Sequence, residues 1–172
     1  GCADYSVSEE YFELWECAVC SLRFTQDVPN QDAILPYYQS EAYISHSDTK
    51  KGLINKLYKL VRSYTLNWKK GLVSHYANTN NKAGALLDIG AGTGAFLHKM
   101  FAANWFVIGL EPDEGARKIC YEKYQLQLNT LAKLGELSNE SFDVITMWHV
   151  LEHVHSLHEY INQIKRVLKK NG

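Results

Sequence analysis

Three glycines within five positions limit what this chain can fold into more than any other feature of its sequence. Gly90, Gly92 and Gly94 lie in the segment LLDIGAGTGAFLHKM, residues 86–100, between a short apolar run and a run with helical spacing. This pattern predicts a buried strand, a tight turn and a helix. Glycine has no Cβ and readily adopts positive φ, so such a turn lets the backbone approach a ligand closely. We therefore expect a ligand site at the end of this strand.

The second half of the chain continues with alternating strand-like and helix-like patterns. Apolar runs predict strands at 85–90, 105–111, 125–129 and 142–148, and helical spacing predicts helices at 95–103, 113–124 and 156–168. Ser156 and Glu159 form the sequence pattern of a capping box at the start of the last helix. This alternation predicts an α/β fold with a parallel sheet and right-handed crossovers.

The first part of the chain has a different character. Apolar side chains at steps of three and four predict one helix of about 20 residues, and they are Ile54, Leu57, Tyr58, Val61, Tyr64 and Trp68. The polar segment NTNNKAG, residues 78–84, marks a predicted domain boundary. We expect an N-terminal extension over 1–82, with a hairpin at 11–25 followed by helices, and a second domain over 83–172.

Two of the four cysteines form a pattern. Cys17 and Cys20 make a C-x-x-C turn in ECAVCSLRF, between two short segments of strand character. The turn is similar to one knuckle of a zinc ribbon, but a structural zinc ion needs four ligands. We interpret the pair as half of a ribbon whose other pair lies upstream, and expect zinc only if upstream cysteines are present. Two ordinary reduced cysteines in a hairpin are the alternative.

Charge and hydropathy exclude several classes of partner. The 18 Lys and Arg residues are balanced by 19 Asp and Glu residues without a long block of like charge, so we expect neither nucleic acid nor an anionic membrane as a partner. No apolar stretch approaches the roughly 18 residues of a membrane span, and the first residues lack a signal-peptide pattern. We therefore expect a cytoplasmic protein.

An acidic residue after the second predicted strand narrows the ligand to a nucleoside cofactor. Glu111 follows Gly90 by 21 residues, where a carboxylate accepts hydrogen bonds from the ribose hydroxyls. The segment GAGTGA, residues 90–95, also satisfies the dinucleotide pattern G-x-G-x-x-A, so a nicotinamide-dependent oxidoreductase is an alternative. Asp88 counts against it, because a carboxylate buried at this strand end requires a cationic or hydrogen-bonding partner. The amino group of a methionine moiety is such a partner.

Four segments carry a resemblance to a known family. LLDIGAGTGAFLHKM, VIGLEPDEGAR, SFDVITMWHVLEHV and IKRVLKKNG resemble, in order, the motifs of class I S-adenosylmethionine-dependent methyltransferases, especially the bacterial group with quinone and small-molecule O- and C-methyltransferases. The resemblance covers residues 84–172, and the preceding residues resemble the extension of a subset in which a complete cysteine ribbon is usual. It implies a Rossmann-like sheet of strand order 3-2-1-4 with flanking helices. It also implies S-adenosyl-L-methionine as cofactor, S-adenosyl-L-homocysteine as product and a small-molecule methyl acceptor.

The resemblance also implies roles for single residues. The methionine part of the cofactor would contact Asp88, Gly90, Ala91, Gly92 and Gly94, the ribose Glu111, and the adenine edge Pro112 and Asp113. Family members often carry an acid after the third strand for the adenine amine, but LNTLAKL has none, so Thr130 or Leu131 would serve through backbone or packing. Trp148 and His149 would line the face where methyl transfer takes place.

The segment HVLEHVHSLH has three interpretations. His149, Glu152 and His153 match the metalloprotease string H-x-x-E-H, which requires a helix; the string directly follows a strand, so we do not expect a protease. Quinone O-methyltransferases that it resembles carry a glutamate-rich version, so a divalent-cation site is a second interpretation. We favour the third, in which Glu152 and His153 fix the loop by hydrogen bonds.

Methyl transfer requires little chemistry from the protein. The reaction is an in-line displacement from an activated sulfonium, so positioning and the exclusion of water provide most of the acceleration. A general base is needed only for an acceptor that arrives protonated, and His149 and His46 are the candidates. Tyr38, Tyr43 and His46 form either a lid over the cofactor or part of the core of the extension.

The end of the chain departs from the family pattern. Family members continue beyond LKKNG into a fifth strand and an antiparallel pair, whereas this chain ends at Gly172. We therefore expect a fragment with an exposed sheet edge that holds the cofactor poorly and is not fully active alone. A small-molecule methyltransferase is the expected function. A scaffold module that keeps the pocket without chemistry is the alternative, but such a module has no use for Asp88 or Glu111.

Overall fold

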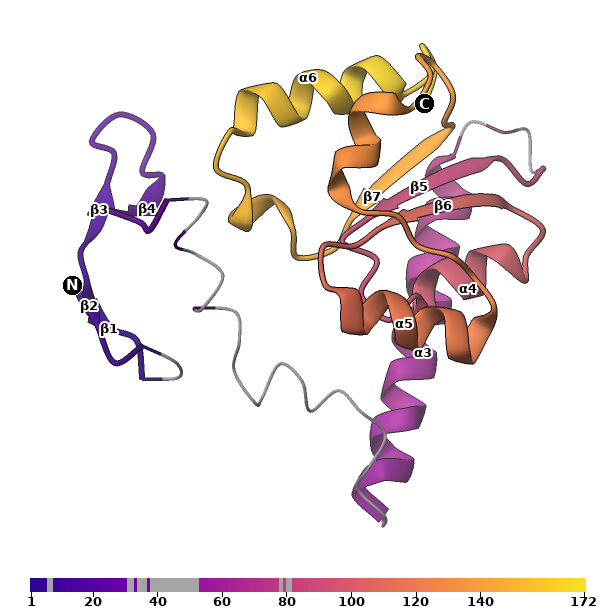
Figure 1. The fold of residues 1–172 in the computed structure, drawn as a ribbon, viewed down its shortest axis with the longest axis horizontal. Helices are drawn as coiled ribbons and strands as arrows, with labels where there is room; N and C mark the ends of the chain where they lie inside the picture. Colours follow the sequence, from indigo (N-terminus) through magenta and orange to yellow (C-terminus); the bar gives the residue numbers. More distant parts are fainter. Residues whose placement is uncertain (6–7, 31–32, 34–36, 38–52, 78, 80–81) are drawn as a thin grey trace. The chain divides into compact units, whose positions relative to one another are not determined.

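The computed structural model describes residues 1–5, 8–30, 33, 37, 53–77, 79 and 82–172, and it describes the side chains of the long helix from residue 59 onward. The chain divides into two compact units, Gly1–Asn55 and Lys56–Gly172 (Figure 1). Tyr38, Tyr43 and His46 lie outside the described residues, so the lid and the base assigned to His46 stay predictions. Within the described part of the chain, no helix is both long and apolar enough to cross a membrane.

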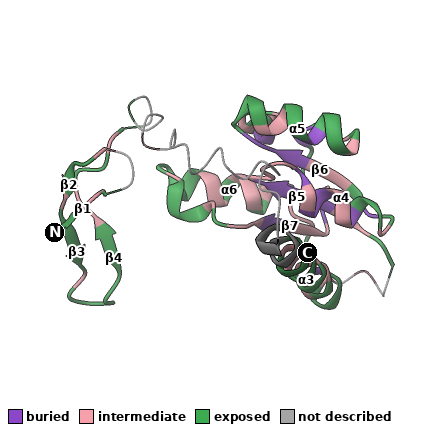
Figure 2. Ribbon diagram, turned by 90° about the horizontal axis from the view of Figure 1, so that it is seen from below, coloured by how far each residue is buried: buried purple, intermediate pink, exposed green. Residues whose placement is uncertain are grey.

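The N-terminal unit contains two short antiparallel strand pairs. Strand β1 (Cys2–Ala3) pairs with β2 (Tyr11–Phe12), and β3 (Leu14–Glu16) pairs with β4 (Arg23–Thr25) inside the segment where a hairpin was expected. Trp15 and Phe24 are cross-strand partners, yet they remain 53% and 43% exposed (Figure 2). Two-stranded pairs with so little buried apolar surface are marginally stable by themselves.

The C-terminal unit is built on a parallel sheet, as the alternating pattern predicts. Strands β5 (Ala85–Ile89), β6 (Phe106–Leu110) and β7 (Val144–Met147) lie in the order β6-β5-β7, with β5 paired to both neighbours in parallel. The buried residues of Figure 2 concentrate on these strands. The first strand is thus central, and its carboxyl end meets those of β6 and β7.

The third predicted strand, residues 125–129, is not a strand in the structure. It is reduced to one parallel bridge between Leu110 and Asn129, supported by hydrogen bonds from Glu111 N to Asn129 O at 2.8 Å and from Asn129 N to Gly109 O at 2.9 Å. The segment is short because Gln125 ends the preceding helix in a left-handed conformation and a 3-10 helix begins at Leu131. The sheet therefore has three strands where four were predicted, although the segment at Asn129 still lies beside β6, where the fourth strand was expected.

Helices cover both faces of this sheet (Figure 1). Helices α3 (Leu53–Tyr76) and α4 (Ala95–Phe101) pack on the face that contains Leu86, while α6 (Leu157–Val167) and the 3-10 helix η1 (Leu131–Glu136) pack on the face that contains Leu87. Helix α5 (Glu114–Tyr124) follows β6 and packs against α4. Because adjacent strand residues point to opposite faces, this explains why Ala85–Ile89 is apolar almost throughout.

Helix α3 packs with a different side than the predicted apolar stripe. Leu66, Val73 and Ala77 contact the sheet cluster, whereas Val61, Tyr64 and Trp68 are exposed. The helix extends well beyond the strands (Figure 1), so only the inward side of its C-terminal part meets them. The compact units separate between Asn55 and Lys56, so α3 from Lys56 onward lies in the same unit as the sheet, whereas the sequence predicts a division at residue 82.

The last helix begins at the predicted place but without the predicted cap. Ser156 is the N-cap residue of α6, yet its side chain makes no capping hydrogen bond. Its backbone carbonyl accepts from Tyr160 N at 3.0 Å, as in an ordinary first turn. The capping box expected from Ser156 and Glu159 is therefore absent, and the helix is held by its apolar contacts, with Val167 fully buried.

Arg166 of α6 links the helix to the segment that precedes β7. Its guanidinium donates to the carbonyls of Leu134 at 2.9 Å and Leu137 at 2.5 Å, and to Asn139 Oδ1 at 2.8 Å. Arginine suits this position because its planar donors reach several acceptors at once. The side chain thereby satisfies carbonyls at the end of η1.

Replacement of Arg166 by lysine should destabilise the C-terminal unit by about 1–3 kcal/mol, because lysine keeps the charge but cannot reach all of these acceptors. Urea unfolding measures the loss. The reverse exchange at the adjacent exposed position, Lys165→Arg, is the matched control and should change stability little. Equal stabilities of the two variants would contradict the assigned role of Arg166.

Candidate functional site

The glycine turn lies at the carboxyl end of β5, beside the end of β6. Gly90 N and Ala91 N both donate to Leu110 O, at 2.8 and 3.0 Å. Ligands of open parallel sheets bind beyond the carboxyl ends of the strands. The turn therefore lies where the sequence places a cofactor site.

Each of the three positions in the turn requires glycine for a different structural reason. All have positive φ, at 72° for Gly90, 54° for Gly92 and 74° for Gly94. A Cβ on Gly90 would meet the Val150 side chain, and one on Gly94 would meet Cys120 Sγ of α5, whereas one on Gly92 would meet nothing within 4 Å. Gly90 and Gly94 thus serve packing, while Gly92 presents bare backbone to open space.

Glu111 joins the glycine turn to the start of α5. Its Oε2 accepts from Gly92 N at 2.7 Å and its Oε1 accepts from Asp113 N at 3.0 Å. Burial raises the pKa of the Glu111 carboxyl, and these two N–H donors act in the opposite direction. Each oxygen keeps acceptor capacity, because a carboxylate oxygen can accept more than one hydrogen bond.

Asp88 is the most deeply buried acid of this region. It is 1% exposed, and its Oδ1 accepts from Thr146 Oγ1 of β7 at 2.7 Å. Burial raises the pKa of Asp88 to about 7; the Thr146 hydrogen bond and the Lys69 charge act against this effect, and the Glu111 charge adds to it. A buried carboxyl so near to its midpoint would gain from a cationic ligand.

The residues after Glu111 form the N-terminus of α5. Asp113 is the N-cap residue, and its Oδ1 accepts from Ala116 N at 2.6 Å. Pro112 O accepts from Arg117 Nη1 at 2.6 Å, and the same nitrogen donates to Glu111 O at 2.7 Å. Arg117 was not identified from the sequence, although its place one turn into the helix after Glu111 is a signal that could have found it.

The two candidates after the third predicted strand differ in burial. Thr130 is exposed and is the N-cap residue of η1 without a side-chain capping bond. Leu131 packs partly against the cluster that covers the Leu87 face. The described contacts of Leu131 are thus with the core and not with the glycine turn.

Trp148 and His149 follow β7 and have opposite environments. The Trp148 ring lies edge-on to Phe96, with ring centroids 5.6 Å apart, and its Nε1 is buried without a hydrogen-bond partner among the described residues. His149 has a φ of 59° and a side chain 90% exposed, with its Nδ1 3.7 Å from Glu152 Oε1. The structure thus places Trp148 against the sheet and His149 toward solvent.

The histidine-rich loop is not a helix of the metalloprotease kind. Leu151–His153 form one short 3-10 turn, η2, and His149 lies before it, so the two histidines of the string do not share an α-helical face. Among the described residues, no group of three or more potential ligands is arranged to hold a metal ion. The loop geometry therefore gives the divalent-cation interpretation no support, and the interpretation as a hydrogen-bonded loop stays a prediction.

Cys17 and Cys20 lie in the turn of the β3–β4 hairpin. The turn is closed by Ser21 N donating to Cys17 O at 2.9 Å and Cys17 N donating to Leu22 O at 2.8 Å. Both thiols are free. Backbone N–H groups of Cys20 and Val19 donate to the Cys17 sulfur and lower its pKa. Such donors favour the thiolate form that binds metals.

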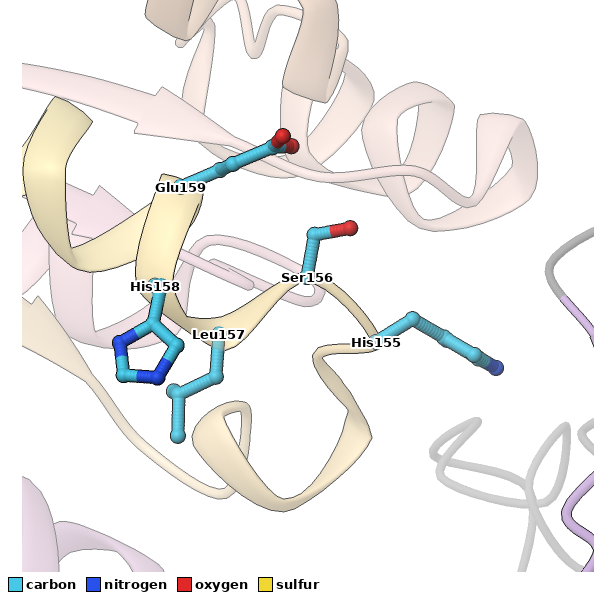
Figure 3. Close-up of a pocket in the computed structure, with 5 residues that line it drawn as sticks. All are labelled: His155, Ser156, Leu157, His158 and Glu159. Atoms are coloured by element: carbon cyan, nitrogen blue, oxygen red, sulfur yellow. The ribbon is translucent and has the colours of Figure 1, made fainter.

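Two hollows lie away from the glycine turn. One, of about 310 Å³, is a shallow depression at the start of α6 lined by His155, Ser156, Leu157, His158 and Glu159 (Figure 3). The other, of about 210 Å³, lies near the amino ends of the strands and is lined by Lys70, Ser74, Thr79, Lys82, Ala83, Ala103 and Trp105. Neither of these two hollows is lined by Asp88 or Glu111.

Comparison with known proteins identifies the family. A family model described as a methyltransferase domain matches residues 63–172, and the chain belongs to this family. The match begins inside α3, which agrees with the packing of that helix on the sheet.

A curated relative gives a more particular likeness. The chain is 29% identical over 99 residues to the ubiquinone biosynthesis O-methyltransferase of Glaesserella parasuis, an alignment that covers 51% of this chain and 42% of that protein. The chain thus spans less than half the length of this relative.

Solved structures share the fold. A SAM-dependent methyltransferase from Archaeoglobus fulgidus superposes with a TM-score of 0.52 at 21% identity, over 63% of this chain and 48% of that one. A candidate S-adenosyl-L-methionine-dependent methyltransferase from Methanococcus maripaludis gives 0.51 at 18% identity, over 60% and 50%. The predicted Rossmann-like α/β class is confirmed by these likenesses.

The donor set at the turn fits S-adenosylmethionine. The buried Asp88 carboxyl suits an ammonium group, and the two oxygens of Glu111 suit a pair of vicinal hydroxyls. The open space at Gly92 admits a ligand against the backbone. Thr146, which orients Asp88, was not identified from the sequence, because its place opposite Asp88 arises from the pairing of β5 with β7.

Gly94→Ala should cost about 2–4 kcal/mol of stability, because the new Cβ overlaps the Cys120 sulfur in addition to its positive φ. Gly92→Ala should cost only about 1–2 kcal/mol, the conformational part alone. Urea unfolding of both variants checks the difference. Equal losses would contradict the distinction between a packing glycine and an open one.

Asp88 should make stability fall as pH rises. Because folding raises its pKa from 3.8 to about 7, the folded chain holds the proton more tightly, and unfolding free energy decreases across this window by up to about 1.4 kcal/mol per pH unit. Asp88→Asn removes the contribution of this group, so its stability relative to wild type should increase between about pH 4 and about pH 7 and level off above that range. Chemical unfolding across this range measures it.

Asp143→Asn is a control of opposite sign. Burial acts to raise the pKa of Asp143, but hydrogen bonds from Ala85 N and Lys169 outweigh it and lower the pKa. Wild-type stability from this group is present above its unfolded pKa and lost as pH falls. A slope in Asp88→Asn that equals the wild-type slope would refute the assignment to Asp88, because Glu111, whose pKa is also raised, contributes only part of it.

Proposed function

We propose that this protein binds S-adenosyl-L-methionine at the glycine turn and transfers its methyl group to a small-molecule acceptor, with S-adenosyl-L-homocysteine as product. The observation that carries the proposal is the linked set of Asp88, Gly92 and Glu111 at adjacent strand ends. Family membership supports methyl transfer as the chemistry. The likeness to a ubiquinone biosynthesis O-methyltransferase supports a small-molecule acceptor.

Each residue of the set has a proposed task. Asp88 accepts the ammonium of the methionine part, and Glu111 accepts the ribose hydroxyls. The backbone of residues 90–94 contacts the methionine part, while Pro112 and Asp113 border the adenine. Thr130 or Leu131 serves the adenine through backbone or packing, and the core contacts of Leu131 favour Thr130. The cofactor supplies an activated methyl group when bound, so the chain has to orient the acceptor and exclude water.

The end of β7 is the proposed acceptor side. The Trp148 indole provides an apolar ring, with the Lys69 ammonium 4.2 Å from its centroid, and a buried N–H that lacks a partner among the described residues. His149 is exposed and close to Glu152, so it can take a proton from an acceptor that arrives protonated. Acceptors that arrive ionised would not need this histidine.

Two further proposals concern the surroundings of the site. We propose that Cys17 and Cys20 provide half of a zinc site that is completed by upstream cysteines, supported by the N–H donors on the Cys17 sulfur. We also propose a cytoplasmic location and no nucleic-acid partner, supported by the near balance of 18 basic and 19 acidic residues.

Calorimetric titration with S-adenosyl-L-homocysteine tests the cofactor. The wild type should bind it, and Glu111→Gln should weaken binding by roughly 10–100-fold, because two charge-assisted hydrogen bonds lose strength. Glu114→Gln, an exposed exchange in the first turn of α5, is the matched control and should bind like wild type. NAD is titrated in parallel. Binding of NAD alone would establish the oxidoreductase alternative, and absence of both would refute cofactor binding by this chain.

A further inference from the structure

The inner side of helix α3 changes from apolar to cationic along its length. Val73 and Ala77 pack over the sheet together with Leu86 and Trp105. Toward the carboxyl ends of the strands, the inward residues are instead Lys69 and Arg62, both partly buried. An all-apolar inner side would be the simpler way to cover a sheet, so the change marks the place where the helix meets the ligand edge.

Both cations contact the described site. The Lys69 ammonium lies 4.2 Å from the centroid of the Trp148 ring. Arg62 Nη2 lies 3.5 Å from Thr93 Oγ1 in the glycine turn. A lysine over an indole face is held by cation–π attraction, which is stronger when the pair is shielded from water. The contact with the Trp148 ring therefore holds the Lys69 side chain at the end of β7.

The Trp148 ring that Lys69 contacts lies on the same side of the sheet as Asp88. Trp148 follows β7 and packs with Val144 against the cluster on the Leu86 side of the sheet, and strand alternation puts Asp88 and Thr146 on this side. Thr146 is the register partner of Asp88 and its hydrogen-bond donor at 2.7 Å. Among the described residues, the groups that act on the Asp88 carboxyl are Thr146 from β7, Lys69 from α3 and Glu111 from the end of β6. Lys69 is the cation of this set.

We propose that Lys69 is a positioning residue that acts through Asp88: held over the Trp148 ring, its ammonium favours the ionised form of the Asp88 carboxyl, which receives the cationic amino group of the cofactor. The inference rests on the proposed function and adds to it the group that controls the charge of the site. Lys69 need not touch the cofactor for this task. Its effect passes through the buried carboxyl.

The sign of the effect follows from the charges. Burial raises the pKa of Asp88, and the positive charge of Lys69 lowers it. Burial also lowers the pKa of Lys69, and the charge of Asp88 raises it in return. Loss of Lys69 therefore leaves Asp88 protonated up to a higher pH. Cofactor binding that requires the carboxylate should move to higher pH by the same amount.

The first measurement needs no cofactor. Carbon-detected NMR follows the Asp88 carboxyl of the whole chain from about pH 5 to about pH 9 in the wild type, Lys69→Met and Lys70→Met, with Asp88→Asn to assign the signal. Lys69→Met should raise the Asp88 pKa by roughly one unit. Lys70 lines the hollow at the amino ends of the strands, so its loss should leave the Asp88 pKa unchanged. Methionine keeps an aliphatic stem over Trp148, which preserves packing.

The second measurement is the affinity for S-adenosyl-L-homocysteine across the same pH range. Lys69→Met should bind about 5-fold more weakly than wild type near pH 7 and up to about 10-fold more weakly at lower pH, and the difference should vanish well above the shifted pKa. Lys69→Arg retains the charge and the contact with the indole, so it should restore the wild-type profile. A merely structural role would weaken binding equally at every pH.

The outcomes separate this inference from the proposed function. An Asp88 pKa that does not move in Lys69→Met overturns the inference even when the wild type binds the cofactor. A loss of affinity that is constant with pH also overturns it, because Lys69 would then contact the ligand directly or support the fold. A shifted Asp88 pKa in a chain that does not bind S-adenosyl-L-homocysteine supports the charge coupling and refutes the proposed function.

Discussion

The carboxylate of Glu111 determines the geometry on which the ligand edge depends. One side chain joins two loops, because its oxygens accept from the backbone of Gly92 in the turn after β5 and of Asp113 at the start of α5. Asp113 in turn caps α5 through Ala116 N. The donors are backbone groups, which cannot reorient without disrupting the turn or the helix start. The turn therefore has its conformation before a ligand arrives.

Two acids are buried at neighbouring strand ends. Their burial destabilises the fold, and the packing of the sheet does not require acids at these positions. Asp88 and Glu111 are 1% and 6% exposed, and the charge of Glu111 disfavours ionisation of Asp88. An apolar residue at position 88 would cover the sheet without this penalty. Such a pair is understandable when a ligand brings a cation and hydroxyl donors to the same edge, because the ligand then recovers what the empty site lacks.

Local patterns were enough to predict the parallel sheet, the glycine turn and the position of Glu111, because each depends on residues close together in sequence. The third strand was predicted from QLQLN, but its pairing is limited to one bridge because helical conformations flank it closely. The prediction of a capping box at Ser156 was wrong for a similar reason. The residue types are present, but the backbone does not bring the Ser156 hydroxyl to its hydrogen-bond partner. Thr146 and Lys69 became site residues only through contacts across strands and helices, which spacing does not encode.

The contribution of α3 changes where the functional unit begins. Composition favoured a boundary in the polar segment 78–84, yet Leu66 and Val73 of α3 cover the sheet face that contains Leu86. The family match begins at residue 63, within the same helix. A unit that started after the polar segment would expose this face and would also lose the cations of the ligand edge. The segment 78–84 is therefore better understood as a connection inside the unit, and polarity alone does not distinguish such a loop from a linker.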